Sequence, residues 1–164
     1  MIKNFKVGDK VVYGVGGISE IVDFTRERVG DVEKEYYVLS ELGSSADSRT
    51  FVPACSERLT SLMRPIISMA EAEALLLKIS EIPPLFWEKD SRKRAELFRT
   101  VLEEGNHERI IAMVKAIRIN GEERAKEGKK NYLADENALR KAEHMLVSEL
   151  STALGRDITS NVIT

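Results

Sequence analysis

In Arg64-Pro65-Ile66-Ile67-Ser68-Met69-Ala70-Glu71 the spacing of apolar residues changes from period two to the period of a helix. Ser68 and Glu71 match a capping box, in which each side chain accepts a hydrogen bond from a backbone N–H at the start of a helix. The sequence therefore predicts an α+β fold. A small β module is expected over residues 1–63 and an all-helical module over residues 64–164.

The β module alternates apolar and polar residues between short turns. Strands are expected at residues 10–13, 18–25, 35–39 and 50–52, with turns at residues 14–17, 28–31 and 43–47. In the second strand, Ile18, Val22 and Phe24 are expected on one face and Ile21 and Thr25 on the other. Four or five short strands with short loops predict a compact barrel of the Tudor or SH3 type.

Four helices are expected after residue 68. Pro83-Pro84 ends the first helix, Gly105 ends the second, and Asn106 caps the third. A polar stretch over residues 121–130 frays or ends the third helix, and the tail after Gly155 is expected to be loose. The inward-facing residues are expected to be Leu97, Phe98, Val101 and Leu102, then Ile110, Ile111, Val114 and Ile117, then Leu139, Ala142, Leu146 and Leu150.

Composition and charge restrict the class of protein. The 43% hydrophobic content is enough for a folded core, and no stretch is long enough to span a bilayer. Residues 1–4 do not begin a signal peptide, so we expect a cytoplasmic protein with no membrane partner. The single cysteine, Cys55, excludes an internal disulfide and a multi-cysteine zinc site. The net charge of −2 argues against a protein that coats nucleic acid non-specifically.

The sequence offers few residues for catalysis. His107 and His144 lie on different expected helices and form no metal-binding pair. Residues 14–17 are rich in glycine but lack the Gly-Lys-Ser/Thr ending of a phosphate loop, so a hairpin turn is the better interpretation. Cys55 has no histidine near it in the sequence. We therefore expect no enzyme activity, no cofactor, no metal site and no small-molecule substrate.

Trp87 is the only tryptophan, and residues 87–130 form the only positive segment, with 12 Lys/Arg against 9 Asp/Glu. Trp87 fits two interpretations: a core aromatic between helices, or an apolar wedge beside cations that contact DNA phosphates. The basic face could equally be an ordinary solvated surface if Glu96 pairs with Arg92. The basic residues that follow the tryptophan are Arg92, Lys93, Arg94 and Arg99, of which the first and last are about 10 Å apart along one helix face.

The order of these motifs resembles that of the CarD/CdnL family of bacterial transcription regulators. The resemblance covers residues 2 to about 154 and includes Trp87. The opening motif alone is shared with the polymerase-binding module of transcription-repair coupling factors, which are long helicases, whereas this chain has no Walker motif. The motifs are Phe5-Lys6-Val7-Gly8-Asp9-Lys10-Val11-Val12-Tyr13, Lys34-Glu35-Tyr36-Tyr37-Val38-Leu39, Val52-Pro53, Arg64-Pro65-Ile66-Ile67-Ser68, Glu104-Gly105-Asn106 and Leu139-Arg140-Lys141-Ala142-Glu143.

The resemblance implies a regulator that docks its β module on the RNA polymerase β subunit, at the β1 lobe. The helical module is then placed at the upstream edge of the transcription bubble, where the family's tryptophan, matched by Trp87, stabilises the open promoter complex. The implied DNA-binding residues are Trp87, Arg92, Lys93, Arg94 and Arg99, with Lys129 and Lys130 in place of a family basic residue that falls near Glu136.

For the polymerase contact, the resemblance implies Arg26, Arg49, Phe51 and Val52. Phe51 occupies a position that is basic in some relatives, so a more apolar contact is expected here. A sheet module can dock by adding a strand at an exposed edge. Tethering by polymerase also explains the acidic total charge, because a tethered protein needs little DNA affinity of its own.

A different interpretation is a protein-interaction adaptor without DNA contact, in which Trp87 belongs to the core. Tryptophan fluorescence separates the two: emission that is solvent-like and easily quenched indicates a wedge, and blue-shifted emission indicates a core residue. In either case a monomer is expected.

Overall fold

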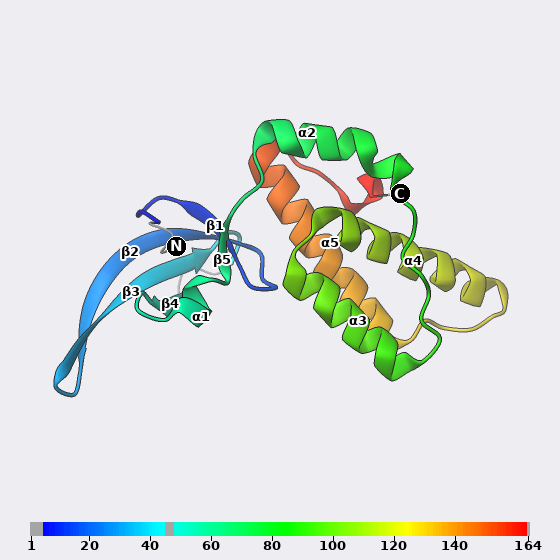
Figure 1. Ribbon diagram of the computed structural model, residues 1–164. Helices are drawn as coiled ribbons and strands as arrows, with labels where there is room; N and C mark the ends of the chain where they lie inside the picture. Colours follow the sequence, from blue (N-terminus) through cyan, green and yellow to red (C-terminus); the bar gives the residue numbers. More distant parts are fainter. Residues whose placement is uncertain (1–4, 45–47, 164) are drawn as a thin grey trace. The chain divides into compact units, whose positions relative to one another are not determined.

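The computed structural model describes residues 5–44 and 48–163. Its contacts divide the chain into two compact units, Met1–Ile66 and Ile67–Thr164, which we call the sheet unit and the helical unit (Figure 1). The boundary between the two units falls within residues 64–71, where the spacing of apolar residues changes from period two to that of a helix. The α+β class expected from the sequence is confirmed.

The sheet unit contains five antiparallel strands in the order β4-β3-β2-β1-β5. The sheet stays open, so the expected closed barrel is wrong in this respect. Closure requires hydrogen bonds between the two edge strands, whereas the segment joining β4 to β5 forms a short helix, α1, with local hydrogen bonds. The strands are β1 (Lys10–Tyr13), β2 (Ile18–Val29), β3 (Val32–Glu41), β4 (Arg49–Pro53) and β5 (Met63–Pro65), and α1 is Glu57–Thr60.

Strand β5 carries the sheet past the expected boundary after residue 63. It pairs with β1, with Tyr13 opposite Met63 and Val11 opposite Pro65. The start of the Arg64–Ser68 motif therefore belongs to the sheet unit. Residues 1–4, and 45–47 of the expected loop at 43–47, lie outside the described residues.

Strands β2 and β3 form a long bent hairpin that turns at Gly30, where φ is +66° (Figure 1). The ladder shifts by one residue between Ile21 and Asp23. A bulge of this kind moves the following side chains to the opposite face. As a result Phe24, opposite Tyr37, lies on the same face as Ile21, opposite Leu39, so the expected placement of Phe24 on the face of Ile18 is wrong.

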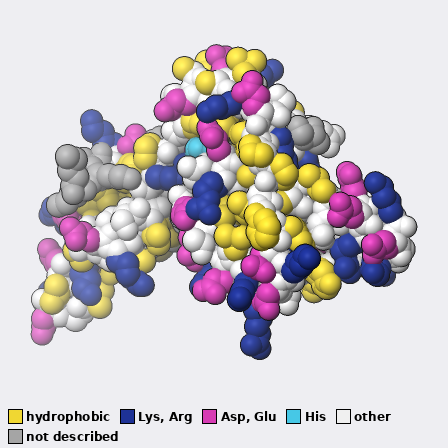
Figure 2. All heavy atoms as spheres, turned by 45° about the vertical axis from the view of Figure 1, so that its right-hand side comes forward, with side chains coloured by type: hydrophobic (Ala, Val, Ile, Leu, Met, Phe, Trp, Pro, Cys, Tyr) yellow, Lys and Arg dark blue, Asp and Glu magenta, His cyan; other side chains and the backbone are white. Residues whose placement is uncertain are grey.

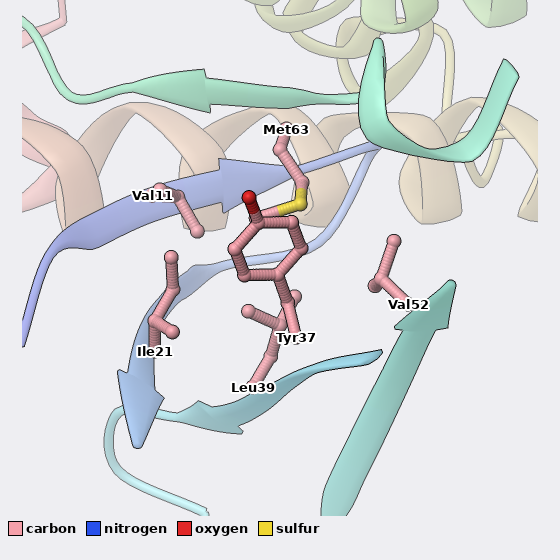
Figure 3. Packing of buried hydrophobic residues seen from close by; sticks show 6 residues of the cluster. All are labelled: Val11, Ile21, Tyr37, Leu39, Val52 and Met63. Carbon is pink, nitrogen blue, oxygen red and sulfur yellow. The ribbon is translucent and has the colours of Figure 1, made fainter. Parts of the chain in front are cut away.

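Six side chains from all five strands form the core of the sheet unit (Figure 3). Tyr37 lies among them with its ring between neighbouring strands, and Phe5 packs on it edge to face at 6.4 Å between ring centroids. Apolar burial of this kind contributes about 25 cal/mol per Å² removed from water. The six residues are Val11, Ile21, Tyr37, Leu39, Val52 and Met63.

The helical unit begins at the capping box, which is confirmed: Ser68 Oγ accepts from the backbone N of Glu71, and Glu71 Oε2 accepts from the backbone N of Ser68. Gly105 ends the second long helix at φ +65°, and Asn106 caps the third, as expected. The elements are α2 (Met69–Lys78), η1 (Ile79–Glu81), α3 (Ser91–Glu104), α4 (His107–Lys126), α5 (Leu133–Leu154) and η2 (Ser160–Val162).

Helices α3, α4 and α5 pack side by side, and α2 packs against α5 (Figure 1). Most of the expected inward stripe is buried, with Leu97 and Leu139 only partly so. Helix α4 runs to Lys126, within the polar stretch where its end was expected. The helical spacing of apolar residues in the sequence thus predicted most of the core of this unit correctly.

The C-terminal tail is folded onto the helical unit, so the expectation of a loose tail is wrong. Ile158 and Ile163 are buried. The Arg118 guanidinium donates hydrogen bonds to the carbonyls of Ser160 (2.9 Å) and Ile163 (2.7 Å). These contacts come from α4, far away in the sequence, and therefore leave no local sign in the tail itself.

Candidate functional site

Trp87 lies on an extended segment between η1 and α3. Pro83 and Pro84 keep this segment from continuing the helix, and Asp90 starts α3 by accepting hydrogen bonds from the backbone N–H groups of Arg92 and Lys93. These hydrogen bonds lower the pKa of the Asp90 carboxyl, with that from Lys93 contributing most. The segment is held on the bundle by the Leu85 N–H, which donates to the Ala112 carbonyl of α4 at 2.9 Å.

The Trp87 side chain is half-buried. Its ring centroid lies 4.7 Å from Arg94 Cζ and 6.1 Å from the Phe98 ring, which is tilted by 58°. The indole is thus packed against α3 in part and accessible in part, so the structure combines features of both interpretations of this residue. Neighbouring Phe86 is far more exposed, at 81%, and was not recognised as a site residue from the sequence.

Arg94 was expected to contact DNA phosphates, but the structure places it in the interior. Its side chain is 3% exposed and pairs with Asp135 of α5, which is 7% exposed. The remaining guanidinium N–H groups donate to the backbone carbonyls of Glu88 and Lys89. With its donors engaged, Arg94 is not available for a phosphate, and its expected role is corrected to one inside the bundle.

A second aromatic residue joins the same cluster. The Tyr132 ring centroid lies 5.3 Å from Arg94 Cζ and 4.1 Å from Arg124 Cζ. Arg124 also donates two hydrogen bonds to the Lys130 carbonyl, which ties down the loop after α4. Tyr132 and Asp135 had no distinguishing signal in the sequence, because their partners lie about 40 residues away on α3.

The other expected DNA-binding residues are exposed. Arg99 lies 3.6 Å from Glu96, so Glu96 pairs with Arg99 and not with Arg92 as considered from the sequence. Among the described residues, the side chains of Arg92 and Lys93 form no ion pair. Lys129 donates to Glu127 and thereby lowers the pKa of that carboxyl. Of the residues expected to bind DNA, Arg92 and Lys93 are thus the cations closest in sequence to Trp87 that remain available to an anionic partner.

The surface around these residues carries both signs of charge. Figure 2 shows hydrophobic side chains gathered on one face of the helical unit, with Lys/Arg and Asp/Glu side chains interspersed around them. The exposed apolar residues of this unit include Leu77, Phe86 and Ile119. Such a mixed surface favours a local contact with nucleic acid over a broad electrostatic one.

In the sheet unit, the expected polymerase-binding residues divide into surface and core. Arg26 is exposed and pairs with Glu35 at 2.8 Å, and Arg49 is exposed at the start of β4. Phe51 is half-exposed, with its ring 6.4 Å from that of Tyr36. Val52 is fully buried in the core, so only its backbone is left for a partner. Strand β4 forms one edge of the described sheet.

The candidate catalytic residues are not brought together. His107 Nε2 lies 3.0 Å from the buried Glu149 carboxylate, close enough for an ion pair but without hydrogen-bond geometry. Cys55 is exposed on an open groove of the sheet unit beside Phe24 and Tyr37. No histidine is among the described residues that line this groove. Within residues 5–44 and 48–163, no three His, Cys, Asp or Glu side chains are grouped to hold a metal ion.

None of the helices described is both long and apolar enough to cross a membrane. A comparison with curated proteins gives no match for this chain.

Residues 5–67 belong to a class of domains that interact with RNA polymerase. The family model that they match is that of the CarD-like/TRCF RID domain. This match confirms the resemblance to CarD-like proteins over the sheet unit and supports a transcription-related role for that unit in binding RNA polymerase. The helical unit, from residue 68 on, lies outside the match, and the assignment to CdnL proteins stays a prediction.

Proposed function

We propose that the sheet unit docks on the β1 lobe of the RNA polymerase β subunit and that the helical unit stabilises the open promoter complex at the upstream edge of the transcription bubble. The family match over residues 5–67 supports the first half. The observation that carries the second half is the half-exposed Trp87, followed five and six residues later by the exposed Arg92 and Lys93, whose side chains form no ion pair with a described residue.

In this proposal, β4 is the docking edge. Its backbone offers unpaired N–H and C=O groups for strand addition, Phe51 supplies an apolar contact, and Arg26 and Arg49 lie nearby on the polymerase-facing surface. Val52 contributes through its backbone alone, because its side chain is buried.

The DNA contact combines an aromatic wedge with a few cations. Trp87 inserts at a base step that polymerase has already opened, which avoids an unstacking cost of a few kcal/mol per step. Arg92, Lys93 and Arg99 contact phosphates from α3, and Lys129 and Lys130 contact them from the loop after α4. Arg94 has no direct DNA contact in this arrangement.

The rest of the proposal follows from these two contacts. The sheet unit, Met1–Ile66, acts as the polymerase-interaction domain and the helical unit, Ile67–Thr164, as the DNA-binding domain of a cytoplasmic monomer. The protein works by binding alone, with no catalytic step, cofactor or small-molecule substrate.

The adaptor interpretation stays open as a second candidate, since Trp87 packs on Arg94 and Phe98. It predicts that Trp87 has no role once polymerase is bound. The proposal instead predicts that Trp87→Ala keeps binding to a polymerase β fragment and shortens the lifetime of the open complex.

Two experiments on the unmodified chain and its variants test the two halves of the proposal. A pull-down with the β fragment tests docking, and failure of the unmodified chain to retain the fragment would overturn the first half. Open-complex lifetimes on a promoter test the second half, with Leu77→Ala as the matched control because Leu77 is an exposed apolar residue of the same unit, outside the proposed site. Equal lifetimes for Trp87→Ala and Leu77→Ala would favour the adaptor.

A further inference from the structure

We infer that the buried ion pair between Arg94 and Asp135 is a clamp that sets the position of the Trp87 side chain. Arg94 is thus a positioning residue. This inference rests on the proposed function for its biological meaning, but the clamp itself is a property of the free protein.

The clamp joins α5 to the backbone beside Trp87. Arg94 Nε and Nη2 donate to the two carboxylate oxygens of Asp135, each at 3.0 Å. Arg94 Nη1 donates to the carbonyl of Glu88 at 2.9 Å and, more weakly, to that of Lys89 at 3.3 Å. The planar guanidinium therefore connects a carboxylate on one helix to the two peptide groups that follow the tryptophan.

The same guanidinium lies over the indole ring. Arg94 Cζ lies 4.7 Å from the Trp87 ring centroid and 5.3 Å from the Tyr132 ring centroid. A cation over an aromatic ring is attracted by the ring's quadrupole, more strongly when water is excluded. Since its hydrogen bonds fix the guanidinium in place, the cation holds the indole that packs on it in a defined position.

Stability alone does not account for this arrangement. A buried ion pair carries a desolvation penalty, and well-packed apolar residues of similar volume are often as stable or more so. An ion pair with bidentate geometry supplies direction, which an apolar pair does not. The geometry therefore points to orientation of Trp87 as the contribution of Arg94.

Arg118 provides a matched comparison within the same unit. It pairs with Glu143 at 2.6 Å and donates to two carbonyls of the tail, so it has a similar set of partners. In the described part of the chain, no aromatic ring lies over its guanidinium. Arg118→Lys therefore disturbs an arginine–carboxylate pair without touching Trp87.

The experiment uses Trp87 as its own reporter, because it is the only tryptophan of the chain. Acrylamide quenching and fluorescence anisotropy are measured on the full chain at a temperature well below unfolding. The variants are Arg94→Lys, Asp135→Asn, the apolar double replacement Arg94→Met with Asp135→Leu, and the control Arg118→Lys. The double replacement removes both charges together and leaves no buried charge unpaired, so it keeps the test available if a single replacement does not fold.

We expect the quenching constant to rise about twofold and the anisotropy to fall in the folded clamp variants, because the indole loses its cation–π contact and its neighbouring anchor. Arg118→Lys is expected to match the unmodified chain. Unchanged quenching in the folded clamp variants, or an equal change in Arg118→Lys, overturns the clamp.

Open-complex lifetimes separate this inference from the proposed function. If both are correct, Arg94→Lys and Trp87→Ala both shorten the lifetime while polymerase β binding is kept. If quenching rises but Trp87→Ala leaves the lifetime unchanged, the clamp stands and the proposed DNA contact fails. If Trp87→Ala shortens the lifetime but Arg94→Lys changes neither quenching nor lifetime, the DNA contact stands and the clamp fails.

Discussion

The neighbours of Trp87 explain how one side chain can be both ordered and accessible. Arg94 and Phe98 cover part of the indole, while the rest is open to solvent. Inserting a flexible side chain between bases costs conformational entropy. A wedge whose side chain is already ordered avoids this cost. Packing on α3 supplies that order, so burial of one part of the ring agrees with a role for the other part.

Phe86 adds a second aromatic residue to the proposed wedge. We expect Phe86→Ala to shorten the open-complex lifetime about five- to 150-fold while leaving polymerase β binding unchanged, since base–aromatic contacts contribute about 1–3 kcal/mol each. Promoter lifetimes measured beside Leu77→Ala, an equally exposed apolar side chain, test this. A lifetime equal to that of the control excludes Phe86 from the contact.

In the sheet unit, Phe51 is the exposed aromatic residue that is proposed to contact polymerase. Phe51→Ala is expected to weaken binding to the polymerase β fragment about tenfold, the usual effect of removing an aromatic residue at the centre of an interface. Titration of the fragment measures this. Val29→Ala, a half-exposed apolar residue at the tip of the β2–β3 hairpin, is the control. Equal losses for the two variants would contradict a specific role for Phe51.

At the scale of elements, the helix ends follow from residues near them in sequence. Asn106 Oδ1 accepts from the backbone N of Arg109 at 3.0 Å and so satisfies one of the unpaired donors at the start of α4. Asn106→Ala is expected to destabilise the helical unit by about 1 kcal/mol. Urea unfolding followed by circular dichroism measures this, and Asn137→Ala, within α5, is the control. A loss no greater than in the control would contradict the capping role.

Asp90 makes the start of α3 sensitive to acid. Its pKa is held below 3.8 in the folded state by the backbone N–H groups of Lys93 and Arg92. A carboxyl with a lowered folded pKa stabilises the fold above its unfolded pKa, and this contribution is lost as the pH falls from about 4 through the folded pKa.

Asp90→Asn isolates this effect, because asparagine caps a helix about as well as aspartate but does not titrate in this range. We expect the two proteins to have similar thermal midpoints at pH 7. Below about pH 4 the unmodified chain is expected to lose stability faster than Asp90→Asn. Parallel unfolding curves across this pH range would contradict the prediction.

At the scale of the whole molecule, two units share one chain with a net charge of −2. In the proposed function, a polymerase-bound sheet unit would raise the effective concentration of the helical unit at the promoter, so the helical unit would need few DNA contacts of its own. This fits the helical unit's mixture of charges, which is poorly suited to binding DNA alone.

Binding to free duplex DNA is therefore expected to be weak and strongly dependent on salt. If the five exposed cations of the proposed site all contact phosphates, log K should fall with log salt at a slope of about −4.5. Fluorescence titrations at several salt concentrations measure the slope. Replacing Arg92 and Lys93 with alanine should reduce its magnitude by about 2, while Lys141→Ala on α5 should leave it unchanged.

The sequence by itself determined the features that depend on near neighbours. The change of period after residue 64, the capping box at Ser68 and the helix boundary at Gly105 and Asn106 were all predicted correctly, because their hydrogen bonds join residues three or four positions apart. The motifs of residues 5–67 were sufficient to identify the polymerase-interacting domain, and the family model confirms them.

Only the tertiary structure decided the features that depend on distant partners. The bulge in β2 moved Phe24 to the face of Ile21, and hydrogen bonds from Arg118 hold the tail on the helical unit. Asp135 lies 41 residues from Arg94 yet turns an apparent surface cation into a buried one. A sequence pattern cannot show such a pairing, because Arg94 and Asp135 meet only when the fold packs α3 against α5.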